Sequence, residues 1–266
     1  MEQYISYFSS VYNQFYNKIY EVDYFLNLLV DNYKIYRTSI SPRDIKQFHI
    51  IQYIFSAFLS ATETCWEIAK VTQDLAEMKD SSQNHKVSET KLENEEYFKN
   101  YFATNDTNLY NLFQFLKKAR NASCHDGTIS FNGGENDKLY FYTDIIRYEK
   151  RNGSYIFVSY PSPKEDVITI MFNMALKLIP LFEAKLIAPP KLTDNELLQQ
   201  ATSMITSIQA TSFKNILNSI GQNQIIQATK KALKDINLLD NHKLEAEKLY
   251  LNWQQLYNSI YEGNLI

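Results

Sequence analysis

The sequence predicts a mainly helical protein that carries a small antiparallel β-sheet. Through most of about the first 120 positions, apolar and aromatic residues recur at spacings of three and four, which is typical of amphipathic helices. Between about 128 and 160 the pattern changes to an alternation of apolar and polar residues, rich in β-branched and aromatic types. That alternation is typical of short strands. After residue 160 the helical spacing returns and continues toward the C-terminus.

Four long helices are expected before the strands, packed as a bundle. Ser41 and Pro42 are typical of the first positions of a helix, and Gly127 is a residue type that commonly follows the last turn. Amphipathic segments lie between these signals, separated by polar loops. The expected helices cover residues 4–36, from Pro42 to about 78, 93–102, and from Leu109 to Gly127.

The strands are expected to form one small antiparallel sheet of two or three strands, inserted after the fourth helix at about 128–160. The stretches NGGEND and RNGS supply the Gly-Gly and Asn-Gly pairs that favour hairpin turns. Another helix is expected at about 164–187, and the stretch APPK that follows it marks a boundary. We therefore divide the chain into a helical bundle with a β insertion, residues 1–190, and a helical C-terminal extension, residues 191–266. The extension is expected to hold helices near 193–209, 212–235 and 242–262.

Composition restricts the classes of function. The 266-residue chain has a formal net charge of −3, so nucleic-acid binding requires a local basic patch rather than a global positive field. Its two cysteines, Cys65 and Cys124, supply neither a disulfide framework nor a paired metal site. The apolar stretches are too short or too interrupted by charge to suggest a membrane span, and the N-terminus lacks the pattern of a signal peptide. We expect a cytoplasmic protein without membrane association.

The stretch KKARNASCHDGT, just before the strands, carries the candidate functional residues. Histidine titrates near neutral pH, so His125 is suited to accept a proton from a ribose 2′-OH or to donate one to a leaving oxygen. Arginine stays charged and can bind a phosphate through two hydrogen bonds, so Arg120 is suited to stabilise charge that grows in a transition state. Asn121 is suited to orient either group. Lys117 and Lys118 add local positive charge for RNA binding.

Regular helical spacing does not bring Arg120 and His125 to one point. Five residues of an ideal α-helix separate two positions by about 140° around the axis and about 7.5 Å along it. Either the helix breaks between the two residues, or two chains meet at a twofold axis and each contributes to the site. A second match to the same pattern, Arg43 and His49, is interpreted as structural. Arg43 lies at a helix start, and His49 enters an apolar stretch.

The stretch LKKARNASCHDG resembles the HEPN superfamily, whose members share a four-helix up-and-down bundle. Their common feature is an arginine, a polar residue that is often asparagine, and a histidine four to six residues after the arginine, at the end of a bundle helix. In this sequence Arg120, Asn121 and His125 occupy those positions. The resemblance covers this short motif and the order of the helices that precede it, and it says nothing specific about the β insertion or the C-terminal extension.

The resemblance implies a metal-independent endoribonuclease, without a cofactor, that acts as a homodimer with a composite active site. In such enzymes the 2′-OH attacks the neighbouring phosphate and leaves a 2′,3′-cyclic phosphate and a 5′-OH end. Many members are toxins or phage-defence proteins, so the resemblance also allows for a neutralising or regulatory protein partner. One subfamily carries a tyrosine two residues after the histidine that a partner enzyme modifies. This sequence departs from that pattern, because Gly127 stands there.

Two other interpretations stay open. One is a non-catalytic module of HEPN type that binds RNA, a nucleotide or a protein partner. The other is purely structural: Arg120 ties down a helix end, and Asn121 and His125 cap the turn before Gly127. Function would then lie elsewhere in the chain.

Other reactive side chains are expected to have ordinary roles. Glu63 and Glu67 lie four residues apart on one helical face without a histidine at a metal-ligand spacing, so a solvated face is expected. Cys124 is expected to be a buried thiol. No metal site is expected from the sequence.

Overall fold

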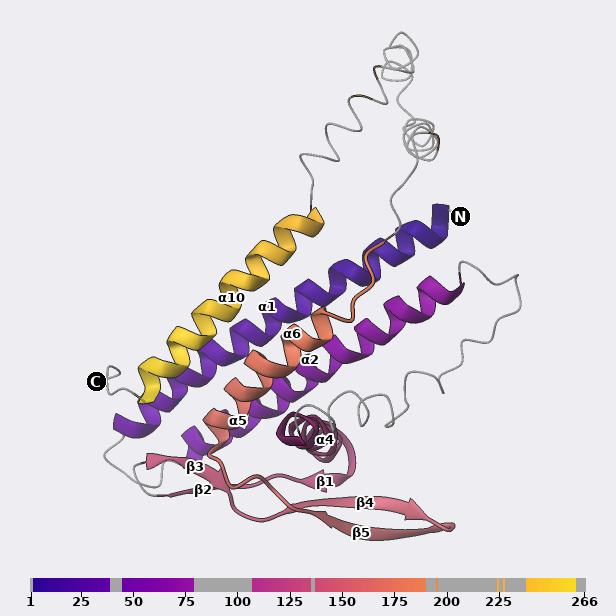
Figure 1. Ribbon diagram of the computed structural model, residues 1–266. Helices are drawn as coiled ribbons and strands as arrows, with labels where there is room; N and C mark the ends of the chain where they lie inside the picture. The colour runs from indigo at the N-terminus through magenta and orange to yellow at the C-terminus, as the bar shows by residue number, and fades with distance from the viewer. Residues whose placement is uncertain are drawn as a thin grey trace, which may run out of the picture.

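The computed structural model describes residues 2–38, 45–78, 107–134, 137–189 and 238–261, together with the single positions 195, 224 and 227. Figure 1 shows long helices above two small antiparallel sheets. The prediction of a mainly helical protein with a small antiparallel β insertion is therefore confirmed. The predicted helix at 93–102 lies outside the described residues, as does the helix start at Ser41 and Pro42. Of the predicted helices at 193–209 and 212–235, only positions 195, 224 and 227 are described.

The two longest helices, α1 (Glu2–Thr38) and α2 (Ile45–Met78), lie side by side along most of their length. Each buries an apolar stripe at spacings of three and four, as the sequence predicts. Tyr7 is 58% exposed, because it lies about 100° around the helix from buried Phe8. The buried stripe of α1 includes Phe8, Val11, Phe15, Ile19, Val22, Leu26 and Leu29.

The fourth predicted helix is present as α4 (Thr107–Asn121), followed by a π-helical turn η1 (Ala122–Asp126) that ends before Gly127. Leu109, Phe113, Leu116 and Ala119 of α4 are buried, and α4 packs on α2. Figure 1 views α4 almost along its axis, while α1 and α2 lie across the view. The axis of α4 is thus not parallel to those of α1 and α2, which departs from the up-and-down arrangement that the resemblance implies.

The β region differs in detail from the single sheet of two or three strands that the sequence predicts. Five short strands form two sheets between residues 127 and 160. The three-stranded sheet has the order β1-β4-β5, with β1 (Gly127–Thr128), β4 (Ile145–Arg151) and β5 (Ser154–Tyr160). The other sheet pairs β2 (Phe131–Gly133) with β3 (Leu139–Phe141). Strands of two or three residues are too short to show an alternation in sequence, so they could not be predicted separately.

The hairpin between β4 and β5 turns at Asn152 and Gly153, as the sequence predicts. Both residues have positive φ, 49° and 83°, respectively. Two central residues of positive φ are characteristic of the type I′ turn, whose twist matches that of antiparallel strands. The register places Tyr148 opposite Phe157 and Lys150 opposite Tyr155.

The helix predicted at about 164–187 begins as α5 (Val167–Asn173). Its N-cap is Asp166, whose carboxylate accepts hydrogen bonds from the Thr169 backbone N–H, at 3.1 Å, and from the Thr169 hydroxyl, at 2.6 Å. The helix then widens to a π-helical segment η3 (Met174–Leu178) and ends as α6 (Ile179–Glu183). Pro180 lacks a backbone N–H and disfavours a regular helix before it, which accounts for the widened segment.

The last predicted helix is present as α10 (Leu238–Tyr261), four residues earlier at its start than predicted. It packs against α1 and the α5–η3 segment. Trp253 is fully buried there, and its indole N–H donates a hydrogen bond to Asp23 Oδ1 at 2.7 Å. The Tyr250 hydroxyl donates to Glu183 at 2.7 Å, and Tyr16 of α1 donates to the same carboxylate at 3.1 Å. This helix therefore shares the core of the preceding ones.

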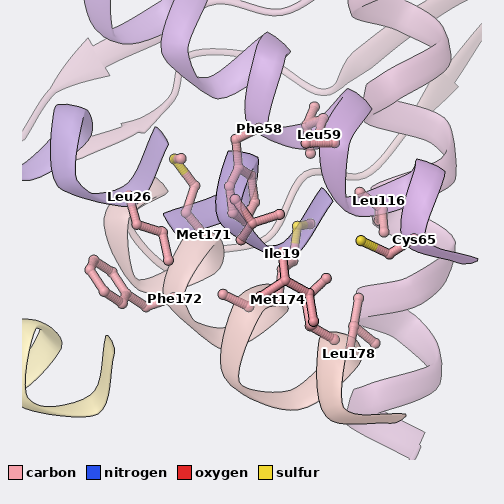
Figure 2. Packing of buried hydrophobic residues seen from close by; sticks show 14 of the residues in the cluster. Ile19, Leu26, Phe58, Leu59, Cys65, Leu116, Met171, Phe172, Met174 and Leu178 are labelled. Carbon is pink, nitrogen blue, oxygen red and sulfur yellow. The ribbon is translucent and has the colours of Figure 1, made fainter. Parts of the chain in front are cut away.

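Figure 2 shows how α1, α2, α4 and the α5–η3 segment meet in one apolar core. The side chains in this core make dispersion contacts and exclude water, but they offer no chemistry. Across the described ranges, no helix is long and apolar enough to cross a membrane. The labelled core residues are Ile19, Leu26, Phe58, Leu59, Cys65, Leu116, Met171, Phe172, Met174 and Leu178.

Candidate functional site

The motif residues lie where the long helix α4 changes into the β-sheet. Arg120 and Asn121 are the last two residues of α4, and His125 lies in the π-helical turn η1. The α-helix therefore ends between Arg120 and His125, which is the first of the two alternatives that their spacing raises. A π-helix joins residues five apart by hydrogen bonds, so the separation of about 140° calculated for an ideal α-helix does not apply to this segment. The side chain of His125 lies outside the described part of the structure.

Arg120 is held by a carboxylate from a different helix. Its Nε atom lies 3.2 Å from Oε2 of Glu63, which belongs to α2. The Arg120 side chain is 33% exposed, whereas that of Glu63 is only 10% exposed. On the other side of the guanidinium, Nη1 donates a hydrogen bond of 3.2 Å to Oδ1 of Asn121. The structure thus brings Arg120 and Asn121 together, and Glu63 joins them.

The effects on the pKa of the Glu63 carboxyl act in opposite directions. Burial raises the pKa of its carboxyl, and Glu67 acts in the same direction, whereas the charges of Arg120, Lys117 and Lys70 lower it; burial is the largest effect, so the pKa is raised. The Arg120 Nε and Glu63 Oε2 atoms form an ion pair, but neither has a well-aligned hydrogen-bond partner. This geometry leaves Glu63 attracted to Arg120 without a directional hydrogen bond at this oxygen.

The expectation that Glu63 lies on a solvated face is wrong. Leu59 and Trp66, four residues before and three after it, are buried, and Glu63 shares their side of α2. Glu67 is exposed, as expected, and forms an ion pair of 2.6 Å with Lys70. The signal that could have found Glu63 is its helical phase: a carboxylate on an apolar stripe requires a buried cation.

The two lysines of the motif point to different surroundings. Lys117 lies over the ring of Phe113, at 5.8 Å, and its charge acts on Glu63. Lys118 lies over the ring of Tyr160, at 4.4 Å from the centroid, and its Nζ is 3.3 Å from the hydroxyl of that tyrosine and 3.9 Å from Glu149. Lys117 is therefore the lysine on the Arg120 side, whereas Lys118 joins α4 to the hairpin.

Glu149 organises the basic residues of the hairpin. Its carboxylate lies 3.5 Å from Arg147 and 3.1 Å from Arg151, and it accepts a hydrogen bond from the Tyr160 hydroxyl. The hydrogen bond from Tyr160 is the largest of the effects that hold the pKa of Glu149 below its ordinary value. The carboxylate therefore stays ionised and neutralises part of the positive charge on this side of the hairpin.

The motif continues directly into the sheet. Gly127 and Thr128 form β1, which pairs antiparallel with β4 so that Gly127 lies opposite Arg147 and Thr128 opposite Ile146. His125 is only two residues before Gly127 in the chain. Sequence reasoning did not single out Arg147, and no local signal could have, because its place beside the motif depends on strand pairing over about twenty residues.

A cleft of about 740 Å³ lies beside α4, but Arg120 is not among its lining residues. It is bordered by Lys118, Gln114 and Asn111 of α4 and by Tyr160 and Lys177 across from them. Positions 118 and 120 of a helix are about 200° apart, so the cleft and the Arg120–Glu63 pair occupy different faces of α4. The cleft therefore includes Lys118 of the motif but not the Arg120–Glu63 pair.

Other reactive groups are placed as follows. Cys124 is exposed, which corrects the expectation of a buried thiol; Cys65 is buried. His49 is exposed and stacks on Tyr53, at 6.4 Å between ring centroids, rather than lying in the core. His242 stacks on Tyr16 at 5.1 Å. Within the described residues, no three His, Cys, Asp or Glu side chains gather as a metal site requires.

Comparison of the chain with protein-family models, with curated proteins and with solved structures finds no match. Function is therefore inferred from the residues and contacts described above.

Proposed function

We propose that the protein is a metal-independent endoribonuclease of HEPN type that cleaves RNA by attack of a ribose 2′-OH, in a toxin or phage-defence setting in the cytoplasm. The observation that carries the proposal is the Arg120 guanidinium, fixed by Glu63 and Asn121 at the end of α4 and followed by His125 after a change of helix type. A guanidinium held in place on two sides is prepared to receive a phosphate without reorganisation.

In this proposal the chain supplies a phosphate clamp and a proton carrier. A guanidinium has five N–H donors, of which one faces Glu63 and one binds Asn121, so donors remain for a phosphate oxygen. His125 carries the proton between the 2′-OH and the leaving 5′ oxygen. The products are a 2′,3′-cyclic phosphate and a 5′-OH end. Lys117 contributes positive charge on the Arg120 side, and Lys118 does so nearer the hairpin.

A homodimer with a composite site belongs to the same proposal. One Arg120–His125 pair supplies one histidine, whereas a twofold axis beside the motif would supply two histidines and two arginines to one phosphate. The proposed domain of HEPN type covers residues 1–190 with its β insertion, and residues 191–266 form the C-terminal extension. A neutralising or regulatory protein partner completes the setting of a toxin.

One observation favours a different candidate, a non-catalytic module of HEPN type that binds RNA, a nucleotide or a protein. Arg120 neutralises the buried carboxylate of Glu63, which is a structural reason for an arginine at this position. The axis of α4, which is not parallel to those of α1 and α2, also departs from the up-and-down bundle of the resemblance. On this alternative, replacement of His125 leaves the biological effect unchanged.

The experiment that tests the proposal is incubation of the purified protein with total RNA and with tRNA in EDTA, followed by mapping of the fragment ends. We expect cleavage by the wild type with cyclic phosphate ends, and none by His125→Ala. The matched control is His49→Ala, which removes the exposed histidine of the second arginine–histidine match and should cleave like the wild type. Equal cleavage by wild type and His125→Ala, or loss of cleavage in His49→Ala alone, would contradict the proposed site.

A further inference from the structure

The β4–β5 hairpin exposes aromatic side chains that proteins usually bury. Phe157 is 73% exposed, Tyr155 59% and Tyr148 40%. Figure 1 shows that the hairpin extends away from the helices, with its turn far from the bundle. Contiguous exposed apolar surface of this kind is typical of a binding site. We name the hairpin aromatic face by the residues that the register places on one side: Ile146, Tyr148, Lys150, Tyr155, Phe157 and Ser159.

The rings of this face are arranged before any ligand binds. Tyr148 and Tyr155 stack with 5.2 Å between centroids and 5° between ring planes, and Tyr148 lies 4.7 Å from Phe157. Two rotatable bonds per side chain and mutual packing limit the conformational entropy that these rings would lose on binding a ligand. They form a continuous aromatic cluster on which further planar rings can stack.

The charge of the hairpin complements a polyanion. Residues 145–160 contain three basic residues against one acidic residue, in a chain whose net charge is −3. Glu149, the acidic residue, lies on the opposite side of the strand pair, where it binds Arg147 and Arg151. On the hairpin aromatic face the charged residue is Lys150, whose ammonium lies 5.9 Å from the centroid of the Tyr155 ring.

The inner end of the hairpin aromatic face lies beside the strand that follows the motif. Ile146, at its inner end, pairs with Thr128 of β1, which is three residues after His125. From Ile146 to Lys150 the strand advances four residues, or about 14 Å. Aromatic side chains on the sheet surface of some RNA-binding domains stack two or three bases.

From these observations we propose that the hairpin aromatic face binds single-stranded RNA, stacking bases on Tyr148, Tyr155 and Phe157 while Lys150 binds the backbone phosphate. This rests on the proposed function and deepens it, because the face would hold an unpaired RNA segment beside the strand that begins two residues after His125. Stacking on aromatic rings tolerates any base, so recognition here selects unpaired RNA rather than a sequence.

The test is the affinity for a fluorescent oligonucleotide whose 2′ positions are all O-methylated, which removes the attacking hydroxyl and prevents cleavage. We expect Tyr155→Ser and Phe157→Ser each to weaken binding by ~5- to 140-fold, since each base–ring stack contributes about 1–3 kcal/mol. Lys150→Gln should weaken binding and reduce the salt dependence by about 0.7 in log K per log salt. The matched control is Tyr142→Ser, an aromatic that is 66% exposed outside the face, which should bind like the wild type.

Circular dichroism and light scattering of every variant complete the experiment. Unchanged affinity in folded Tyr155→Ser and Phe157→Ser overturns the proposal. So does a wild-type dimer that Phe157→Ser converts to monomers without a change in oligonucleotide affinity, which would assign the face to contact between two copies. Oligonucleotide binding that depends on Phe157, without any RNA cleavage, supports RNA binding by the hairpin aromatic face and contradicts the proposed ribonuclease activity. Cleavage of unmodified RNA by Phe157→Ser with the wild-type KM contradicts RNA binding by the face alone.

Discussion

The Nε atom of Arg120 lies 3.2 Å from Oε2 of Glu63, and this ion pair joins the end of α4 to the buried side of α2. Replacing Arg120 therefore changes both the candidate site and the stability of the fold. A loss of activity in an Arg120 variant has no single meaning until these two effects are separated. A Glu63 variant separates the two effects, because removing the charge of Glu63 removes the structural need for the arginine.

Arg120→Met should lower the free energy of unfolding by about 2 kcal/mol, because it leaves a buried carboxylate without its cation. The figure is below the roughly 3–5 kcal/mol typical of fully buried pairs, since the Arg120 side chain is 33% exposed. Adding Glu63→Gln should restore most of this loss. Urea unfolding of the wild type, both single variants and the double variant measures the coupling. A stable double variant that no longer cleaves RNA would assign Arg120 a role in the reaction as well, and an additive loss would contradict the pair.

Burial raises the pKa of Glu63, which fixes the direction of a pH effect. A raised pKa means that the folded chain holds this proton more tightly than the unfolded chain. The stability that protonated Glu63 contributes is present below the unfolded pKa and is lost as the pH rises through the folded pKa. We therefore expect the wild type to lose stability relative to Glu63→Gln as the pH rises from 4.5, the ordinary pKa of a glutamate, measured by urea unfolding. The free energy of unfolding of Glu67→Gln, a change at an exposed position, should follow that of the wild type over this pH range. If the wild type instead gains stability relative to Glu63→Gln as the pH rises, the charge of Arg120 outweighs the effect of burial.

The two lysines of the motif should differ in their effect on RNA binding. Lys118 is engaged by Tyr160 and Glu149, whereas Lys117 lies on the side of Arg120. Lys117→Gln should weaken binding of an uncleavable oligonucleotide and reduce its salt slope by about 0.7. Lys118→Gln should have the smaller effect on the slope. Equal slopes for the two variants would show that the separation of their side chains does not matter for binding.

Gly153→Ala should destabilise the hairpin by about 1 kcal/mol. The added methyl group meets nothing within 4 Å, so the cost comes from the φ of 83°, which residues with a Cβ disfavour. Thermal unfolding measures the change. Gly153→Asn is the control, because asparagine tolerates positive φ, and it should cost less than alanine. If both substitutions are neutral, the turn does not have the conformation described.

Trp253→Ala should lower the free energy of unfolding by about 3–5 kcal/mol, as removal of a fully buried indole does in other cores. It also leaves Asp23 without the hydrogen bond from the indole. Leu251→Ala, at a position of α10 that is 61% exposed, should change stability by less than about 0.5 kcal/mol. Similar stabilities for the two variants in urea unfolding would show that α10 does not belong to the core.

The elements that the sequence predicts well are those whose pattern is long and local. The helices α1 and α2 each repeat an apolar stripe over many turns, and the turn at Asn152 and Gly153 has a sequence preference of its own. The division of the β region into two sheets depends on pairing between strands of two or three residues, which no local pattern encodes. The π-helical turns escape prediction for the same reason, since they follow from how the chain must leave α4 and approach Pro180.

The residues of the candidate site likewise differ in whether the sequence alone predicts them. Arg120, Asn121 and His125 are visible as a short motif, because they lie within six residues of one another. Glu63 contacts Arg120 from α2 through helix packing, and Arg147 of β4 lies opposite Gly127 through strand pairing. The chemistry of the motif can therefore be predicted from its residues, whereas the carboxylate that holds the arginine requires the three-dimensional fold.

The chain passes from α4 through η1 into β1 without an intervening loop. Arg120 is anchored to α2 on one side, and Gly127 is anchored opposite Arg147 on the other, so the number of residues between the anchors is fixed. Strand residues alternate between the two faces of a sheet, and a shift of one residue exchanges those faces. The motif is thus a connection of fixed length. Substitutions within it alter its chemistry, but the gain or loss of a single residue would shift either the end of the helix or the register of the sheet.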